Sequence, residues 1–80
     1  MYHVYVIKSI KHDYYYKGHC SDLDKRILEH NSGKTQSNKP YLPFRLVYSE
    51  SFAHKHEAIA REKFFKTAAG RRFLRNKLQP

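Results

Sequence analysis

The sequence predicts an α+β domain in which a small three-stranded antiparallel sheet is flanked by helices, in the order ββαβαα. Two segments, residues 2–8 and 14–19, are rich in aromatic and β-branched side chains and are separated by a polar turn. A third segment, residues 44–52, alternates apolar and polar side chains as a half-buried strand does. The chain has 80 residues, which is room for a single domain over residues 1–80.

The first two predicted strands form a hairpin, with residues 11–13 as its turn. Successive side chains of a strand point to opposite faces of its sheet. We therefore expect Tyr14 and Tyr16 on one face, and Tyr15 and Lys17 on the other.

The first helix is expected to begin at Ser21, which is a favourable N-cap residue, and two aspartates in its first turn suit the positive end of the helix dipole. It should run to about Asn31 and end at Ser32 and Gly33. Residues 32–43 are polar and contain two prolines, so we expect a loop there.

The C-terminal half is predicted to contain one strand and two helices. Strand residues expected to share one face are Phe44, Leu46 and Tyr48. A second helix is expected from about residue 54 to residue 66, and Thr67 is placed to cap a third helix that extends through residues 71–77. Gly70 weakens the prediction of that third helix, because glycine costs about 1 kcal/mol relative to alanine.

The chain is strongly basic, with 16 Lys and Arg against 7 Asp and Glu, a net charge of +9 and a pI near 9.9. This balance favours an anionic partner, most often nucleic acid. Of that charge, +6 lies in residues 61–80, where Glu62 is the one acidic side chain. The cations there, including Arg71, Arg72 and Arg75, either follow a phosphate backbone or form a solvated face of a helix.

The single cysteine, Cys20, excludes an internal disulfide and fits a reducing compartment. No apolar run reaches the length that spans a membrane, and the N-terminus lacks the apolar stretch of a signal peptide. The expected location is the cytoplasm, with no membrane partner.

Arg26 and His30 are the first candidates for a functional site. Together with Leu23 and Ile27 they form one helical stripe. Because the two apolar residues must face the core, the basic pair should border that face. The alternative is that both residues are only structural. The aliphatic stem of the arginine would then cover apolar surface, and the histidine would lie at the edge of the core.

Glu62 interrupts another apolar stripe, made by Ala58, Ile59 and Phe65 in the second predicted helix. A carboxylate is rarely placed there without a partner. Either a bound metal ion or an ion pair with Arg26 would explain it.

Tyr5, Tyr16 and Gly18 lie in the two hairpin strands, in the tripeptides His3-Val4-Tyr5 and Tyr16-Lys17-Gly18. Tyrosine is a normal core residue of small sheets, and a glycine at a strand end commonly marks a turn or bulge. Such a glycine also lets a phosphate approach the backbone.

These residues, in this order, resemble the GIY-YIG endonuclease superfamily, and most closely its small standalone bacterial members. The similarity covers nearly the whole chain, in the stretches 2–7, 16–18, 22–34, 43–52 and 57–66. His3 stands where the family has its first glycine, and Lys17 replaces the central isoleucine of the second tripeptide. Lys17 should point away from Tyr16, toward a phosphate or solvent.

The resemblance implies metal-dependent hydrolysis of phosphodiester bonds, with DNA as the expected nucleic acid. It implies that Mg²⁺ or Mn²⁺ is held by Glu62, that Arg26 offsets charge on the phosphate, and that Gly18 allows close approach. It also implies that Tyr5 or Tyr16 activates water and that His30 orients that tyrosine or accepts its proton. An asparagine follows the glutamate in larger members, and Asn76 is a possible match.

A tyrosine has an ordinary pKa of about 10, so a tyrosine base would need nearby cations to lower that pKa. The choice between the two phenols stays open. An alternative function is a nucleic-acid-binding module that keeps the fold but cleaves little alone, because specificity must come from this chain's own surface or from a protein partner. A basic protein-interaction domain is a third reading, supported only by the small size.

Overall fold

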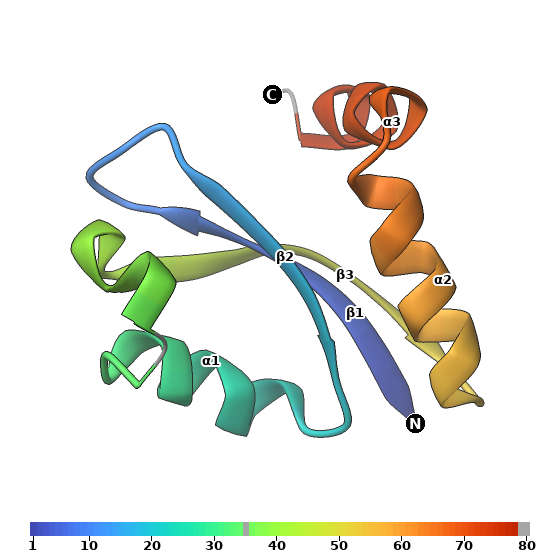
Figure 1. Cartoon of the computed structure of the whole chain (residues 1–80), viewed down its shortest axis with the longest axis horizontal. Coiled ribbons are helices and arrows are strands. Elements are labelled where there is room, and N and C mark those ends of the chain that lie inside the picture. The colour runs from blue at the N-terminus through green and yellow to red at the C-terminus, as the bar shows by residue number, and fades with distance from the viewer. Residues whose placement is uncertain (35, 79–80) are drawn as a thin grey trace.

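The computed structural model describes residues 1–34 and 36–78, and it confirms the predicted α+β fold and order of elements. The elements, shown in Figure 1, are β1 (Tyr2–Ser9), β2 (Tyr15–Cys20), α1 (Leu23–Asn31), the short 3₁₀ helix η1 (Gln36–Tyr41), β3 (Phe44–Phe52), α2 (Lys55–Phe65) and α3 (Ala68–Leu78). The three strands pair antiparallel in the order β2-β1-β3. Helix α1 and η1 lie on one side of the sheet, and α2 and α3 lie on the other (Figure 1). Within the described residues, no helix combines the length and the apolar character needed to cross a membrane.

The central strand β1 divides the core into two halves. Val4 and Val6 are fully buried against Phe65 of α2 and Leu74 of α3. Tyr5 lies between them and belongs to the other half, against α1 and η1. Because helices cover each side of the sheet, the alternating side chains of β1 contribute to both halves of the core.

The prediction that Phe44, Leu46 and Tyr48 share a face is wrong, because β3 contains a bulge. Val6 pairs with Tyr48 but Ile7 pairs with Leu46, so the register shifts by one residue. An extra residue offsets the alternation of side chains beyond it. Phe44 thus packs in the half with α1, Tyr48 packs in the half with α2 and α3, and Leu46 is 40% exposed.

Helix α1 begins one residue later than predicted. Asp22, not Ser21, is its N-cap, and the Asp22 carboxylate accepts a hydrogen bond from the backbone N–H of Lys25. The predicted end is confirmed, with Gly33 at a φ of 81° in the left-handed region that favours glycine.

The segment predicted as a loop, residues 32–43, contains the 3₁₀ helix η1. Proline is accepted in such a short, tight helix near its end, and Pro40 lies inside this one. The Asn31 side chain then bonds both backbone groups of Phe44, donating to the carbonyl at 3.1 Å and accepting from the N–H at 2.7 Å. These two hydrogen bonds fix the point after η1 at which the chain rejoins the sheet.

Helices α2 and α3 agree with the predicted segments. His54 is the N-cap of α2 and Lys66 its C-cap. Thr67 caps α3 as predicted, because its hydroxyl accepts a hydrogen bond from the N–H of Gly70 at 3.0 Å. Arg61 of α2 binds Glu50 of β3 at 2.8 Å, which ties the helix to the sheet and neutralises one cation.

Gly70 is required by the contact between α2 and α3, and Gly70→Ala tests this. A Cβ at this position would overlap the backbone carbonyl of Phe64 and lie 2.7 Å from the Cα of Phe65. Because backbone cannot move aside as a flexible side chain can, we expect a loss of ~1–3 kcal/mol in the free energy of unfolding. Urea denaturation measures it, with the exposed helical neighbour change Ala69→Gly as control, expected to cost about 1 kcal/mol. A more stable Gly70→Ala protein would contradict the packing.

Candidate functional site

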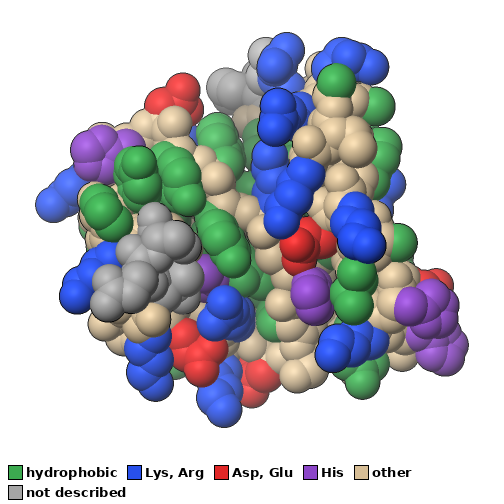
Figure 2. Space-filling model, viewed as in Figure 1, with side chains coloured by type: hydrophobic (Ala, Val, Ile, Leu, Met, Phe, Trp, Pro, Cys, Tyr) green, Lys and Arg blue, Asp and Glu red, His purple; other side chains and the backbone are tan. Residues whose placement is uncertain are grey.

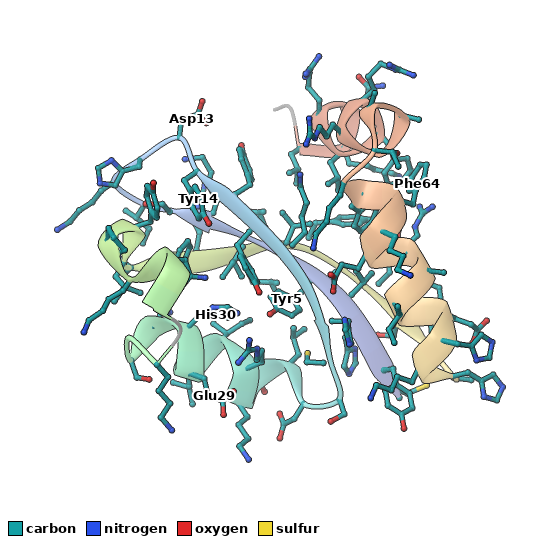
Figure 3. The ribbon with its side chains drawn as sticks, in the orientation of Figure 1. Tyr5, Asp13, Tyr14, Glu29, His30 and Phe64 are labelled. Carbon is teal, nitrogen blue, oxygen red and sulfur yellow. The ribbon has the colours of Figure 1, made fainter. Side chains whose placement is uncertain are left out.

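The hydroxyl group of Tyr5 is the centre of a buried polar cluster between β1 and α1 (Figure 3). It lies 2.8 Å from Nε2 of His30, and Nε of Arg26 donates to it at 3.3 Å. Tyr5 is 1% exposed and His30 is completely buried. The sequence placed His30 at the border of the core, whereas the structure places it inside, with Arg26 at the border.

Asn38 contacts the ring nitrogen of His30 that faces away from Tyr5. Its amide nitrogen is 3.1 Å from Nδ1 of His30. A neutral imidazole has one N–H donor and one acceptor nitrogen, so His30 donates to one of these two partners and accepts from the other. Burial, and then the charge of Arg26, lower the pKa of His30 and favour this neutral form.

Sequence reasoning missed Asn38, which lies in η1, within the segment expected to be a loop. Its side chain is buried, and its Oδ1 has no hydrogen-bond partner among the described residues. One amide in a polar segment gives no periodic signal, so only the fold shows that it reaches His30.

The Tyr5 hydroxyl accepts a hydrogen bond from Arg26 and shares another with Nε2 of His30. Burial raises the pKa of Tyr5 to about 12, although the Arg26 hydrogen bond and charge act to lower it. The nearby cation does not bring the pKa of this phenol below its ordinary value, as a tyrosine base would need, because loss of hydration outweighs the charge of Arg26. Tyr5 keeps its proton near neutral pH and holds the two basic side chains in place.

Tyr16 and Gly18 of β2 complete this face of the sheet. The Tyr16 ring centre lies 6.3 Å from that of Tyr5 and 4.8 Å from that of His30, and Tyr16 is half-buried. Gly18 pairs directly with Tyr5 across the strands. A Cβ on Gly18 would lie 2.6 Å from the Tyr5 oxygen, so this glycine makes room for the hydroxyl.

Arg26 keeps donors free for a ligand. Its Nη1 contacts Glu29 at 3.2 Å and its Nε binds Tyr5, while the side chain is 33% exposed. A guanidinium has five N–H donors, so others remain for a phosphate group. Glu29, also missed by the sequence reasoning, steadies the arginine from the same helix.

Glu62 reaches β2 from the opposite face. Its Oε1 is 2.7 Å from Nδ1 of His19, and its Oε2 accepts from Lys66 at 2.9 Å. The alternative of an ion pair with Arg26 is therefore wrong, because His19 and Lys66 take both carboxylate oxygens. Burial acts to raise the pKa of Glu62, but hydrogen bonds from Lys66 and His19 bring it below its usual value, so the carboxylate is charged at neutral pH.

The structure thus brings Tyr5, Tyr16, Arg26 and His30 together on the α1 face, while Glu62 lies on the α2 face. The edge strand β2 separates them, with Gly18 on one side and its neighbour His19 on the other. His19 has no metal-ligand spacing in the sequence, and only the fold places it against the carboxylate.

A metal ion at Glu62 would have few protein ligands. Among the described residues no group of three His, Cys, Asp or Glu side chains is placed to hold one. Mg²⁺ commonly binds proteins through one or two carboxylates and takes its other ligands from water and substrate phosphate. A single charged carboxylate fits that pattern.

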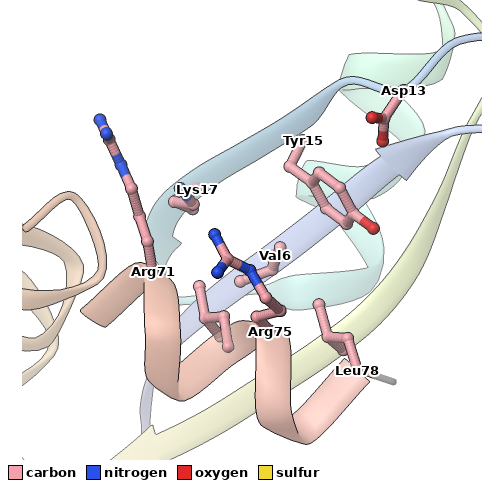
Figure 4. A pocket seen from close by; sticks show the side chains of 8 residues that line it. Val6, Asp13, Tyr15, Lys17, Arg71, Arg75 and Leu78 are labelled. Carbon is pink, nitrogen blue, oxygen red and sulfur yellow. The ribbon is translucent and has the colours of Figure 1, made fainter. Parts of the chain in front are cut away.

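The predicted nucleic-acid contacts lie on the α3 side. Lys17, Arg71 and Arg75 line one pocket between β2 and α3 (Figure 4). Arg72 and Asn76 are exposed on α3 and do not line it. Figure 2 shows that Lys and Arg side chains gather over α2 and α3, next to the sheet.

A family model described as "GIY-YIG catalytic domain" matches residues 1–78. The chain belongs to this family. UPF0213 protein YazA of Bacillus subtilis is 37% identical over 65 residues, covering 80% of this chain and 66% of YazA. UPF0213 protein SSP2268 of Staphylococcus saprophyticus is 36% identical over 74 residues, covering 91% of this chain and 89% of that protein.

The solution NMR structure of the UPF0213 protein BH0048 from Bacillus halodurans has the same fold, with a TM-score of 0.59 and 30% identity. The comparison covers 100% of this GIY-YIG chain and 89% of that one. Several other relatives are longer: this chain spans 54% of UPF0213 proteins from Streptococcus pneumoniae and Bacillus pumilus.

Gly18→Ala tests the close contact with Tyr5. The added methyl group would displace the phenol, so we expect unfolding to become easier by ~1–3 kcal/mol. The double variant Gly18→Ala/Tyr5→Phe lacks the oxygen at 2.6 Å, and it should cost less than the sum of the two single changes. Denaturant unfolding of all four proteins measures the coupling, and simple additivity would argue against the contact.

The buried phenol predicts a late titration for Tyr5. With the side-chain ring carbons of tyrosine labelled, NMR should show one resonance, absent in Tyr5→Phe, that titrates with a pKa of about 12. Arg26→Ala should raise this pKa further, because the guanidinium acts to lower it. Lys55→Ala, a charge change at the start of α2, serves as control. A Tyr5 resonance that titrates below pH 10 would contradict burial as the dominant cause.

Proposed function

We propose that this GIY-YIG protein is a metal-dependent endonuclease that hydrolyses phosphodiester bonds of DNA. The observation that carries the proposal is the convergence of Tyr5, Tyr16, Arg26 and His30 in one cluster. A partly exposed guanidinium, held by a buried phenol, presents donors to a phosphate from a position that is already fixed.

The two tyrosines have different surroundings, and this supports different roles. Tyr5 is buried, keeps its proton, and positions Arg26 and His30. Tyr16 is half-buried, and its ring contacts that of His30 in a tilted arrangement, with 4.8 Å between the ring centres. Of the two phenols, Tyr16 is the one that a water molecule or substrate can reach, so we assign it the contact with the attacking water.

Hydrogen bonds to Tyr5 hold His30 and Arg26 in place. The neutral His30 ring bonds the Tyr5 hydroxyl through Nε2 and contacts Asn38 through Nδ1. Arg26 would bind the phosphoryl oxygens, where negative charge develops during hydrolysis. Both roles follow from hydrogen bonds already made without substrate.

Glu62 is the residue that would hold Mg²⁺ or Mn²⁺. A divalent ion there supplies Lewis-acid stabilisation of the scissile phosphate and of the leaving oxygen. Each Glu62 oxygen accepts one hydrogen bond, from His19 or from Lys66, and keeps a second lone pair for a metal ion. The Lys66 ammonium, 2.9 Å from Oε2, would however repel a cation at this carboxylate. That repulsion favours the second candidate function, a nucleic-acid-binding module that cleaves little by itself and gains specificity or activity from a protein partner.

Cleavage of labelled plasmid, single-stranded, branched and RNA substrates, with Mg²⁺ or Mn²⁺ and with chelator, tests the proposal. We expect metal-dependent cleavage of DNA that falls ~100-fold or more in Arg26→Ala, because a donor to the transition state is lost. Glu62→Gln should lose activity and need more metal, and Tyr16→Phe should lose activity without loss of DNA binding.

The exposed change Lys55→Ala is the matched control and should cleave normally. Cleavage that survives Arg26→Ala and Glu62→Gln together would refute the proposed site. Salt-sensitive binding of DNA with no cleavage under any metal would instead establish the binding module.

A further inference from the structure

A second basic site lies on the opposite face of the sheet from Tyr5. A pocket of about 510 Å³ opens between β2 and α3, and Figure 4 shows Arg71 and Arg75 rising from the helix opposite Lys17 and Tyr15 of the strand. Val6, Leu74 and Leu78 form its apolar part, and Asp13 is the one acidic side chain among the described residues that line it. Three cations against one carboxylate make this a pocket for an anion.

The pocket continues toward Glu62. Lys17 and His19 are two residues apart on β2, so they share a face, and His19 contacts the Glu62 carboxylate. Burial, and then the charges of Arg71 and Lys66, lower the pKa of Lys17. These cations are therefore close enough to interact, and they form a row from the Glu62 carboxylate into the pocket.

Tyr15 gives the pocket an aromatic surface. It is 40% exposed and lines both this pocket and a second one of about 410 Å³, whose cations are Lys8, Arg45 and Lys77. The Lys8 ammonium lies 5.8 Å from the centre of the Tyr15 ring. An exposed aromatic ring among cations is the arrangement that binds unpaired bases by stacking while the cations hold the phosphates.

We propose that the groove between β2 and α3 binds a single-stranded segment of DNA, with Arg71, Arg75 and Lys17 on the phosphates and one unpaired base on Tyr15. This rests on the proposed function, since the segment would leave the duplex or branch next to the phosphate at Glu62. Substrates with an unpaired strand would then be preferred to continuous duplex.

Binding without metal separates this inference from cleavage. The full chain, in chelator, is titrated into a fluorescent 12-nucleotide oligothymidylate and into a duplex of equal length, followed by anisotropy. Tyr15→Ala should weaken binding of the single strand roughly 5- to 100-fold and Tyr15→Phe should not, because stacking needs the ring and not the hydroxyl. Duplex binding should change little in either variant.

The salt dependence of binding tests the contacts with the phosphates. Arg75→Ala and Arg71→Ala should each reduce the slope of log Kd against log salt by about 0.7, the value for one phosphate contact on a single strand. Lys55→Ala removes the same charge from the start of α2 and should leave the slope as it is. On the wild type, NMR shifts on adding oligothymidylate should concentrate in residues 15–17 and 71–78.

Equal losses in Lys55→Ala and Arg75→Ala, or normal single-strand binding by Tyr15→Ala, would overturn the inference. Shifts confined to the α1 face would also overturn it. If the predicted binding is found but no metal supports cleavage, the groove stands and the proposed nuclease function fails. If cleavage is found but substitution of Tyr15 does not change binding, the proposed nuclease function stands and the inference about the groove fails.

Discussion

The burial of the Tyr5 hydroxyl is the constraint on which the rest of the site depends. A buried hydroxyl must be hydrogen-bonded, and this one is satisfied by His30 and Arg26 from a single helix turn of α1. Those bonds fix the position of α1 over the sheet. Asn38 then holds His30 from η1, and Gly18 leaves the space that the hydroxyl needs.

The two faces of the sheet carry different kinds of side chain. One face carries the tyrosine, histidine and arginine cluster, and the other carries the apolar core of α2 and α3 with a basic rim. The edge strand β2 takes part in both, because Tyr16 and Gly18 point to one side while Tyr15, Lys17 and His19 point to the other. A nucleic acid lying across this edge could contact both faces at once.

Two features of the site oppose easy catalysis. Burial holds the pKa of Tyr5 at about 12, and both oxygens of Glu62 are bound by His19 and Lys66. In the proposed function, the buried phenol therefore supports Arg26, and the half-buried Tyr16 contacts the attacking water. The Glu62 carboxylate stays charged because its partners offset the cost of its partial burial.

The sequence by itself determined the family, through the order of its motifs, and it determined the order of elements and most of their limits, because apolar periodicity and capping residues act locally. It also singled out Tyr5, Tyr16, Arg26 and His30, which the fold brings together. It missed Asn38, the bulge in β3 and the partners of Glu62, since each depends on which distant segments meet. Tertiary structure alone decided that burial outweighs the cations at Tyr5, and that β2 lies between the tyrosine cluster and Glu62, because desolvation and the two faces of a sheet exist only once the chain is packed.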